Sequence, residues 1–132
     1  MLETTPVRFL FAGTIGFVVD ASVLHVLVTS LDVSPIRGRV ASYLCASFVT
    51  WRINRTFTFR AEVTNYWLSE WLHYQWASGI GAAVNYTVYA LLVIALPLVA
   101  HAPTIGVAAG SVAGMVFNYL LYKRVVFRKR PV

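Results

Sequence analysis

The sequence predicts an all-α membrane protein with four transmembrane helices, built as two repeated helical hairpins with cytoplasmic N- and C-termini. Three observations lead to this fold class: the composition, an internal repeat, and the distribution of basic residues. Apolar residues make up 58% of the 132 positions and charged residues only 12%. That composition is too apolar for a soluble domain of this length, so the helices are expected to lie in a bilayer.

The repeat is clearest where the second and fourth apolar runs end. At a shift of 68 positions, Arg55 falls on Lys123 and Phe59 on Phe127. The first and third runs match at a shift of 65. Internal duplication of this kind is typical of membrane transporters. The other matched positions are Ser42, Ala46 and Thr50 with Gly110, Gly114 and Asn118, and Ala12, Gly16 and Asp20 with Ala77, Gly81 and Asn85.

Three apolar runs have the length of a membrane span, which needs roughly 20 mostly apolar residues. They cover residues 9–31, 74–100 and 104–122. The second run, residues 40–51, has only twelve residues, or about 18 Å of helix. It is either a re-entrant segment or a full span with basic residues inside the membrane. Its alignment with the fourth run favours the full span.

The chain is expected to form one domain over residues 1–132, with repeat halves at 8–60 and 73–128. The connector, residues 61–72, carries Trp67 and Trp71 at helical spacing, which predicts a short amphipathic helix in the membrane interface. These indoles have two interpretations. They form an aromatic belt before the third span, or, together with Trp51, a platform for a sugar headgroup.

Basic residues give the expected orientation. Nine of the eleven Lys and Arg residues belong to the N-terminus, the central loop and the C-terminal tail, whereas Arg37 and Arg39 lie in the first hairpin loop. This bias places both termini and the central loop in the cytoplasm. Because the net charge of +6 is concentrated at the ends of apolar runs, the expected partner is an anionic lipid rather than a nucleic acid.

Intramembrane polar residues are the first candidates for function, because each is costly unless it is paired or used. Asp20 lies eleven residues beyond Phe9, about 16 Å along a helix and close to the expected midplane. One interpretation is that protonation neutralises this carboxylate, or that a neighbouring Arg or hydroxyl holds it. The other is that it acts as a proton-linked or ligand-responsive switch. The expected polar pathway consists of Asp20, Asn54, Asn85 and Asn118.

Cations at the cytoplasmic ends of the spans are candidate phosphate ligands. The repeat partner of Arg52 is Leu120, so Arg52 should lie about one turn inside the interface. An Arg guanidinium donates two hydrogen bonds at once to a phosphate. The alternative is that these side chains snorkel to anionic headgroups without specificity. The candidate set is Arg8, Arg52, Arg55, Lys123 and Arg124.

Signals of enzymatic chemistry are lacking in the sequence. It has no phosphate-cradling glycine loop, no metal-ligand cluster and no plausible catalytic triad. The single Cys45 excludes an intramolecular disulfide. We therefore expect neither an enzyme nor a cofactor or metal site.

Three motifs resemble the GtrA-like family over nearly the whole chain. Arg8-Phe9 opens a span containing Gly13 and Gly16, residues 54–59 read Asn-Arg-Thr-Phe-Thr-Phe, and residues 123–127 read Lys-Arg-Val-Val-Phe. The resemblance implies a small multi-pass protein of the bacterial inner membrane that helps to move polyprenyl-phosphate sugars for cell-surface polysaccharides. It also implies that five motif positions matter, namely Arg8, Asp20, Asn54, Arg55 and Lys123.

These observations predict a flippase for a polyprenyl-phosphate-linked monosaccharide. Four spans leave little room for a headgroup, so we expect a homodimer, with Gly110 and Gly114 as a contact face unless they pack helices within one subunit. One alternative is a non-transporting anchor that recruits a polyprenyl-dependent glycosyltransferase. Another is a proton-coupled exporter of small cations that depends on Asp20.

Overall fold

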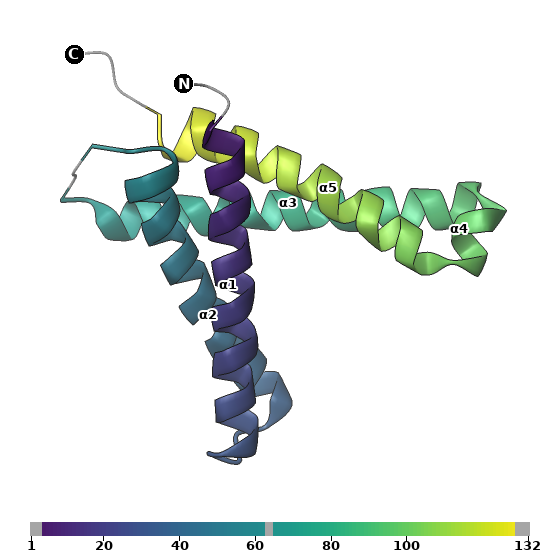
Figure 1. The fold of residues 1–132 in the computed structure, drawn as a ribbon, viewed down its shortest axis with the longest axis horizontal. Coiled ribbons are helices and arrows are strands. Elements are labelled where there is room, and N and C mark those ends of the chain that lie inside the picture. The colour runs from purple at the N-terminus through teal and green to yellow at the C-terminus, as the bar shows by residue number, and fades with distance from the viewer. Residues whose placement is uncertain (1–3, 63–64, 129–132) are drawn as a thin grey trace. The chain divides into compact units, whose positions relative to one another are not determined.

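The computed structural model describes residues 4–62 and 65–128, and all regular structure in these ranges is helical. The chain divides into two units, Met1–Thr64 and Asn65–Val132. Each unit contains one helical hairpin (Figure 1). The predicted all-α architecture is therefore confirmed.

The first hairpin consists of α1 (Thr4–Thr29) and α2 (Pro35–Ile53), followed by a π-helix, η1 (Asn54–Thr58). The two long helices pack against each other in opposite directions (Figure 1), and η1 contacts α1. Asp32 adopts a left-handed backbone conformation, with φ of 50°, in the turn between them. A proline in the first turn of α2 suits a helix start, because the missing N–H would have no intrahelical acceptor there.

The second hairpin consists of α3 (Trp67–Ala95), the short α4 (Pro97–His101), α5 (Pro103–Leu121) and a second π-helix, η2 (Tyr122–Val126). Pro97 ends α3, because proline lacks the N–H of a helix interior and pushes the preceding residue, Leu96, into an extended conformation. From there α4 leads into α5, which packs along α3.

The two hairpins end in the same way. Both α2 and α5 are 19 residues long, begin with proline and continue into a five-residue π-helix. The Phe59 N–H donates to the Asn54 carbonyl at 2.8 Å, and the Phe127 N–H donates to the Tyr122 carbonyl at 2.8 Å. The bounds of these elements differ by the 68-residue shift seen in the sequence.

Small residues allow close contact between the helices of each hairpin. A Cβ built on Gly16 would lie 2.2 Å from Thr50 Cγ2, and one built on Gly81 would lie 1.8 Å from Asn118 Oδ1. Ala12 is fully buried in the first hairpin. The Gly16–Thr50 contact of the first hairpin corresponds to the Gly81–Asn118 contact of the second, since the repeat matches Gly16 with Gly81 and Thr50 with Asn118.

Three helices in the described ranges are long and apolar enough to cross a membrane, rather than the four expected. They extend over Thr5–Thr29, Trp67–Ala95 and Thr104–Val126. With 19 residues, α2 is longer than the twelve-residue apolar run. However, it includes Arg37, Arg39 and Arg52. An ordinary membrane span contains fewer charged residues than this.

Two boundaries also differ from the expectation. Residues 67–72, which we expected in a separate interfacial connector, form the first turns of α3, because no helix-breaking residue separates them from the apolar run. We expected the third run to continue through residue 100. The helix that it forms ends at Ala95, before Pro97.

Candidate functional site

The Asn-Arg-Thr-Phe-Thr-Phe motif forms η1 and the residue after it, at the end of the first hairpin. Asn54, Arg55 and Thr58 are buried there, with 2%, 5% and 4% of their surfaces exposed. Their burial concentrates polar groups at a helix end, and π-helices are frequent at functional sites. The periodicity of an α-helix could not reveal this local change of winding.

Arg55 connects η1 to the segment that leaves the hairpin. Its Nη2 donates a hydrogen bond to the Glu62 carbonyl at 2.6 Å, and the Ala61 N–H donates to the Arg55 carbonyl at 2.8 Å. A buried guanidinium needs such acceptors, because a buried charge without them is strongly unfavourable. Arg55 therefore holds the chain after η1 in place.

Arg8 lies against the same π-helix. Its Nη1 donates to the Phe57 carbonyl at 3.3 Å, and its guanidinium carbon lies 4.9 Å from the centroid of the Phe57 ring. The side chain remains partly exposed. The structure thus brings two of the predicted cations, Arg8 and Arg55, to η1 from opposite ends of the hairpin sequence.

Arg52 and Trp51 occupy different environments at the end of α2. Arg52 is exposed, with its guanidinium carbon 5.8 Å from the Trp51 ring centroid. Trp51 is only 1% exposed and packs against Phe48, with ring centroids 5.4 Å apart. Because so little of its ring is accessible, Trp51 does not form the predicted headgroup platform in this structure.

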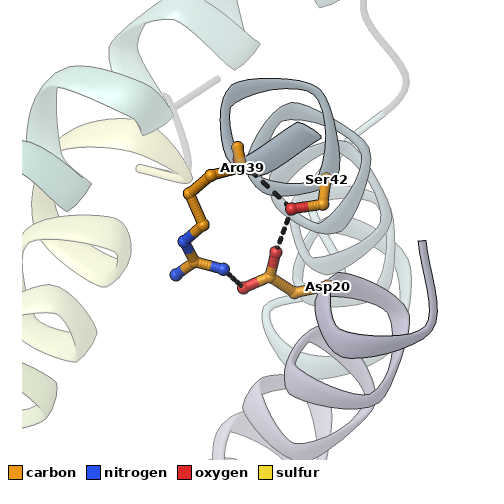
Figure 2. A network of polar contacts seen from close by, with 3 residues as sticks. All are labelled: Asp20, Arg39 and Ser42. Atoms are coloured by element: carbon orange, nitrogen blue, oxygen red, sulfur yellow. Dashed lines mark hydrogen bonds and ion pairs between the residues drawn. The ribbon is translucent and has the colours of Figure 1, made fainter. Parts of the chain in front are cut away.

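Asp20 is paired with two residues of α2, as Figure 2 shows. It forms an ion pair with Arg39, through Asp20 Oδ2 and Arg39 Nη1. Ser42 Oγ lies 2.6 Å from Asp20 Oδ1 and 3.1 Å from the Arg39 carbonyl oxygen. Of the interpretations open for Asp20, the geometry matches a carboxylate held by a neighbouring arginine and hydroxyl.

Sequence reasoning missed Arg39, which it assigned to the loop of the first hairpin. The apolar run begins only at Val40, so the residues before it resemble a loop. A signal was nevertheless present: Pro35 is a favoured helix start, and a helix from Pro35 places Arg39 and Ser42 on one face, three positions apart.

Asp20 lies nearer to the C-terminal end of α1 than to its N-terminal end. We placed it near the midplane by counting from Phe9, but α1 begins at Thr4. At a rise of about 1.5 Å per residue, Asp20 lies about 24 Å from Thr4 and about 13 Å from Thr29. The Asp20–Arg39 ion pair therefore lies nearer to the turn of the hairpin than to η1.

Asn85 and Asn118 pack against glycines in the second hairpin. A Cβ on Gly110 would lie 2.5 Å from the Asn85 carbonyl oxygen, and one on Gly114 would lie 2.7 Å from the Gly81 carbonyl oxygen. Both Gly110 and Gly114 are thus used to pack α5 against α3. These contacts match the alternative that the two glycines pack helices within one subunit. The homodimer itself stays a prediction.

The cations of the second hairpin lie at η2. Lys123 and Arg124 are exposed, and Lys123 Nζ lies 5.8 Å from the Tyr119 ring centroid. Beneath them, Tyr122 stacks on Tyr74 with ring centroids 4.1 Å apart. At the other indole positions, Trp67 is 49% exposed and Trp71 is partly buried, both in the first turns of α3.

Comparison with known protein families identifies the family to which this chain belongs. Its sequence matches the family described as GtrA/DPMS, transmembrane domain, over residues 8–127. The chain belongs to this GtrA/DPMS family. No curated protein matches the chain.

The match confirms the predicted resemblance and covers both hairpins. The GtrA/DPMS domain begins at Arg8 and ends at Phe127, so it includes the arginine that contacts η1 and the phenylalanine that follows η2. Within the part of this GtrA/DPMS protein that the structure describes, no group of three or more His, Cys, Asp or Glu side chains could hold a metal ion. The polar groups that the fold does gather are cations at η1 and an ion pair nearer the hairpin turn.

Proposed function

We propose that this protein is a flippase that translocates a polyprenyl-phosphate-linked monosaccharide across the bacterial cytoplasmic membrane, for glycosylation of cell-surface polysaccharides. Membership of the GtrA/DPMS family supports this proposal. The observation that carries it is the cationic end of the first hairpin. There Arg8 is partly exposed beside η1, and Arg52 is exposed on the preceding turn.

In the proposed topology, the basic ends of the hairpins are cytoplasmic and α2 crosses the membrane with α1. Three features make α2 tolerable in a bilayer despite its charges. Arg39 is paired with Asp20, whereas Arg37 and Arg52 lie in the first and last turns, from which long side chains reach the interface. The 19 residues of α2 rise about 28 Å, close to the thickness of a hydrocarbon core.

Arg8 and Arg52 capture the phosphate in this proposal, because a guanidinium offers a planar pair of donors to phosphate oxygens. Arg55 keeps the residues after η1 in position rather than binding the lipid directly, since its Nη2 is already engaged by Glu62. Lys123 and Arg124 provide exposed charge at the end of the second hairpin. The headgroup passes the polar groups Asp20, Asn85 and Asn118, while the polyprenyl tail stays in lipid.

The rival functions differ in what they require of Asp20. A cation exporter needs a carboxylate that is available to its substrate, but Asp20 is engaged by Arg39 and Ser42. The same ion pair is compatible with a non-transporting anchor for a glycosyltransferase. The anchor hypothesis is therefore the one that the experiment must separate from the flippase.

The test is transbilayer movement of a nitrobenzoxadiazole-labelled polyprenyl-phosphoryl-glucose in liposomes that contain the pure protein, measured by dithionite quenching. Arg8→Gln removes one partly exposed set of hydrogen-bond donors and should slow movement by about tenfold or more. Arg128→Gln is the matched control, because it also removes one cation, which is exposed and belongs to the second hairpin rather than to η1. It should move the probe at the wild-type rate.

Absence of protein-dependent movement would overturn the flippase proposal. Co-purification of a glycosyltransferase in that case would favour the anchor. Equal losses in Arg8→Gln and Arg128→Gln would show that net charge, rather than a site at η1, determines the rate.

A further inference from the structure

The Arg39 guanidinium is only partly used by the protein. An arginine has five N–H donors, and Arg39 directs Nη1 at Asp20. Within the described residues, its other N–H groups have no acceptor. The Arg39 side chain is 59% exposed, whereas that of Asp20 is 16% exposed. One edge of the guanidinium is therefore held in place and the other faces outward.

The position of Arg39 complements that of the cations at η1. It lies in the second turn of α2, about 6 Å along the helix from Pro35. Arg52 and Arg55 lie at the opposite end of the same helix and η1, with Arg55 about 24 Å further along at α-helical rise. A single hairpin thus presents arginines near both of its ends, on a scale close to the hydrocarbon thickness of a membrane.

Asp20 does not depend on Arg39 alone. Ser42 Oγ lies 2.6 Å from Asp20 Oδ1, on the carboxylate oxygen that Arg39 does not contact. If the guanidinium turns towards another anion, the hydroxyl still satisfies one oxygen of the carboxylate. Figure 2 shows one carboxylate oxygen of Asp20 directed at the Arg39 guanidinium and the other at the Ser42 hydroxyl.

We propose that Arg39 is a second phosphate-binding residue, which receives the lipid phosphate near the turn of the first hairpin while Asp20 serves as its exchangeable counter-ion. This inference rests on the proposed function. In the empty protein, Asp20 neutralises Arg39 and orients it. When the phosphate arrives, it takes the open edge of the guanidinium and competes with the carboxylate, which keeps the Ser42 hydroxyl as a hydrogen-bond partner. Departure of the phosphate restores the ion pair.

A purely structural ion pair makes the opposite prediction for paired substitutions. If Arg39 only neutralises Asp20, then Arg39→Gln combined with Asp20→Asn removes both charges together and should restore movement. If Arg39 binds the phosphate, the double variant remains slow, because the receiving guanidinium is gone. The double variant also avoids leaving an unpaired carboxylate, which is the main reason why Arg39→Gln alone could fail to fold.

The experiment measures movement of the same labelled polyprenyl-phosphoryl-glucose in liposomes that contain the wild type, Arg39→Gln, Asp20→Asn or the double variant. The expected result is a loss of about tenfold or more in both variants that lack Arg39. Asp20→Asn frees the guanidinium, so we expect it to bind the probe more tightly in detergent than the wild type does. Arg37→Gln is the control, since it removes an exposed cation two positions away on the same helix.

The outcomes separate this inference from the proposed function. Wild-type movement together with a double variant as fast as the wild type would overturn the role of Arg39 and leave the flippase standing. A similar loss in Arg37→Gln would also overturn it, since any cation near the turn would then suffice. No movement by the wild type would instead overturn the proposed function, and with it the inference.

Discussion

Gly16 lies directly against Thr50, and this contact sets how closely α1 and α2 approach. A Cβ on the glycine would come within 2.2 Å of Thr50 Cγ2. The threonine cannot easily turn away, because its Oγ1 lies 2.9 Å from the Ala46 carbonyl oxygen and 3.0 Å from that of Ser47. Its branched Cβ further restricts the side chain.

Gly16→Ala should therefore destabilise the first hairpin by about 1–3 kcal/mol, because an added methyl group overpacks a rigid contact. Gly13→Ala is the matched control, since no atom lies within 4 Å of a Cβ at that position. Alanine should stabilise the helix there by up to about 1 kcal/mol. Unfolding of both variants in detergent measures the difference. Equal stabilities would contradict the close packing.

Ser42→Ala removes the hydroxyl beside Asp20 and should cost about 1.5–3 kcal/mol of unfolding free energy, the range for a hydrogen bond to a charged group. Ser34→Ala is a suitable control, because Ser34 is exposed and its side chain makes no capping hydrogen bond to α2. Thermal unfolding of the two variants in detergent provides the comparison. If the losses are alike, Ser42 does not hold the carboxylate.

Arg55→Ala should lower stability by about 3 kcal/mol, because it deletes a buried charged donor and leaves a cavity at η1. Arg8→Gln should leave stability within about 0.5–1 kcal/mol of the wild type, since its contact with Phe57 is longer and partly exposed. Limited proteolysis after residue 60 measures release of the following segment. Rapid cleavage is expected only in the Arg55 variant.

Tyr122→Phe should be much milder than Tyr122→Ala. The phenylalanine keeps the stack on Tyr74, where the ring centroids are 4.1 Å apart, and loses the hydroxyl contact with Ser78. The alanine removes a ring that is 3% exposed, which typically costs about 3–5 kcal/mol for a large aromatic side chain. Unfolding in detergent should rank the wild type, the Phe variant and the Ala variant in that order.

Single-tryptophan variants should report which face of each helix meets lipid. Trp76 on α3 is 73% exposed, whereas Trp51 on α2 is 1% exposed. With the other tryptophans replaced by phenylalanine, brominated lipid tails should quench Trp76 strongly and Trp51 weakly. Equal quenching would mean that Trp51 is not buried within the first hairpin in a bilayer.

Much of the fold could be predicted from the sequence, because the repeat shifts identify which positions correspond. They align Gly16 with Gly81 and Thr50 with Asn118. In the structure, Gly16 meets Thr50 in the first hairpin and Gly81 meets Asn118 in the second. Helix ends were harder to predict. Hydropathy places the start of α2 at Val40, whereas backbone hydrogen bonding places it at Pro35.

The candidate site was predicted only in outline. The motif residues Arg8 and Arg55 do lie at the same π-helix, but the sequence could not show that Arg55 is buried and binds a backbone carbonyl. Burial depends on how residues 59–62 fold back, which no local pattern specifies. The partner of Asp20 was missed for a related reason. Hydropathy averages treat an arginine as the end of a span, even where a carboxylate on the preceding helix neutralises it.

The arginines of α2 have a consequence for how the protein is made. A helix that contains Arg37, Arg39 and Arg52 is a poor candidate for insertion by itself. Each arginine opposes insertion, by about 2.5–3.5 kcal/mol at the centre of a segment and by less near its ends. The pairing with Asp20 offsets part of this cost only when α1 is alongside. During synthesis, α1 should therefore stay at the insertion machinery until Arg39 and Ser42 have left the ribosome. The two helices should then enter the lipid together.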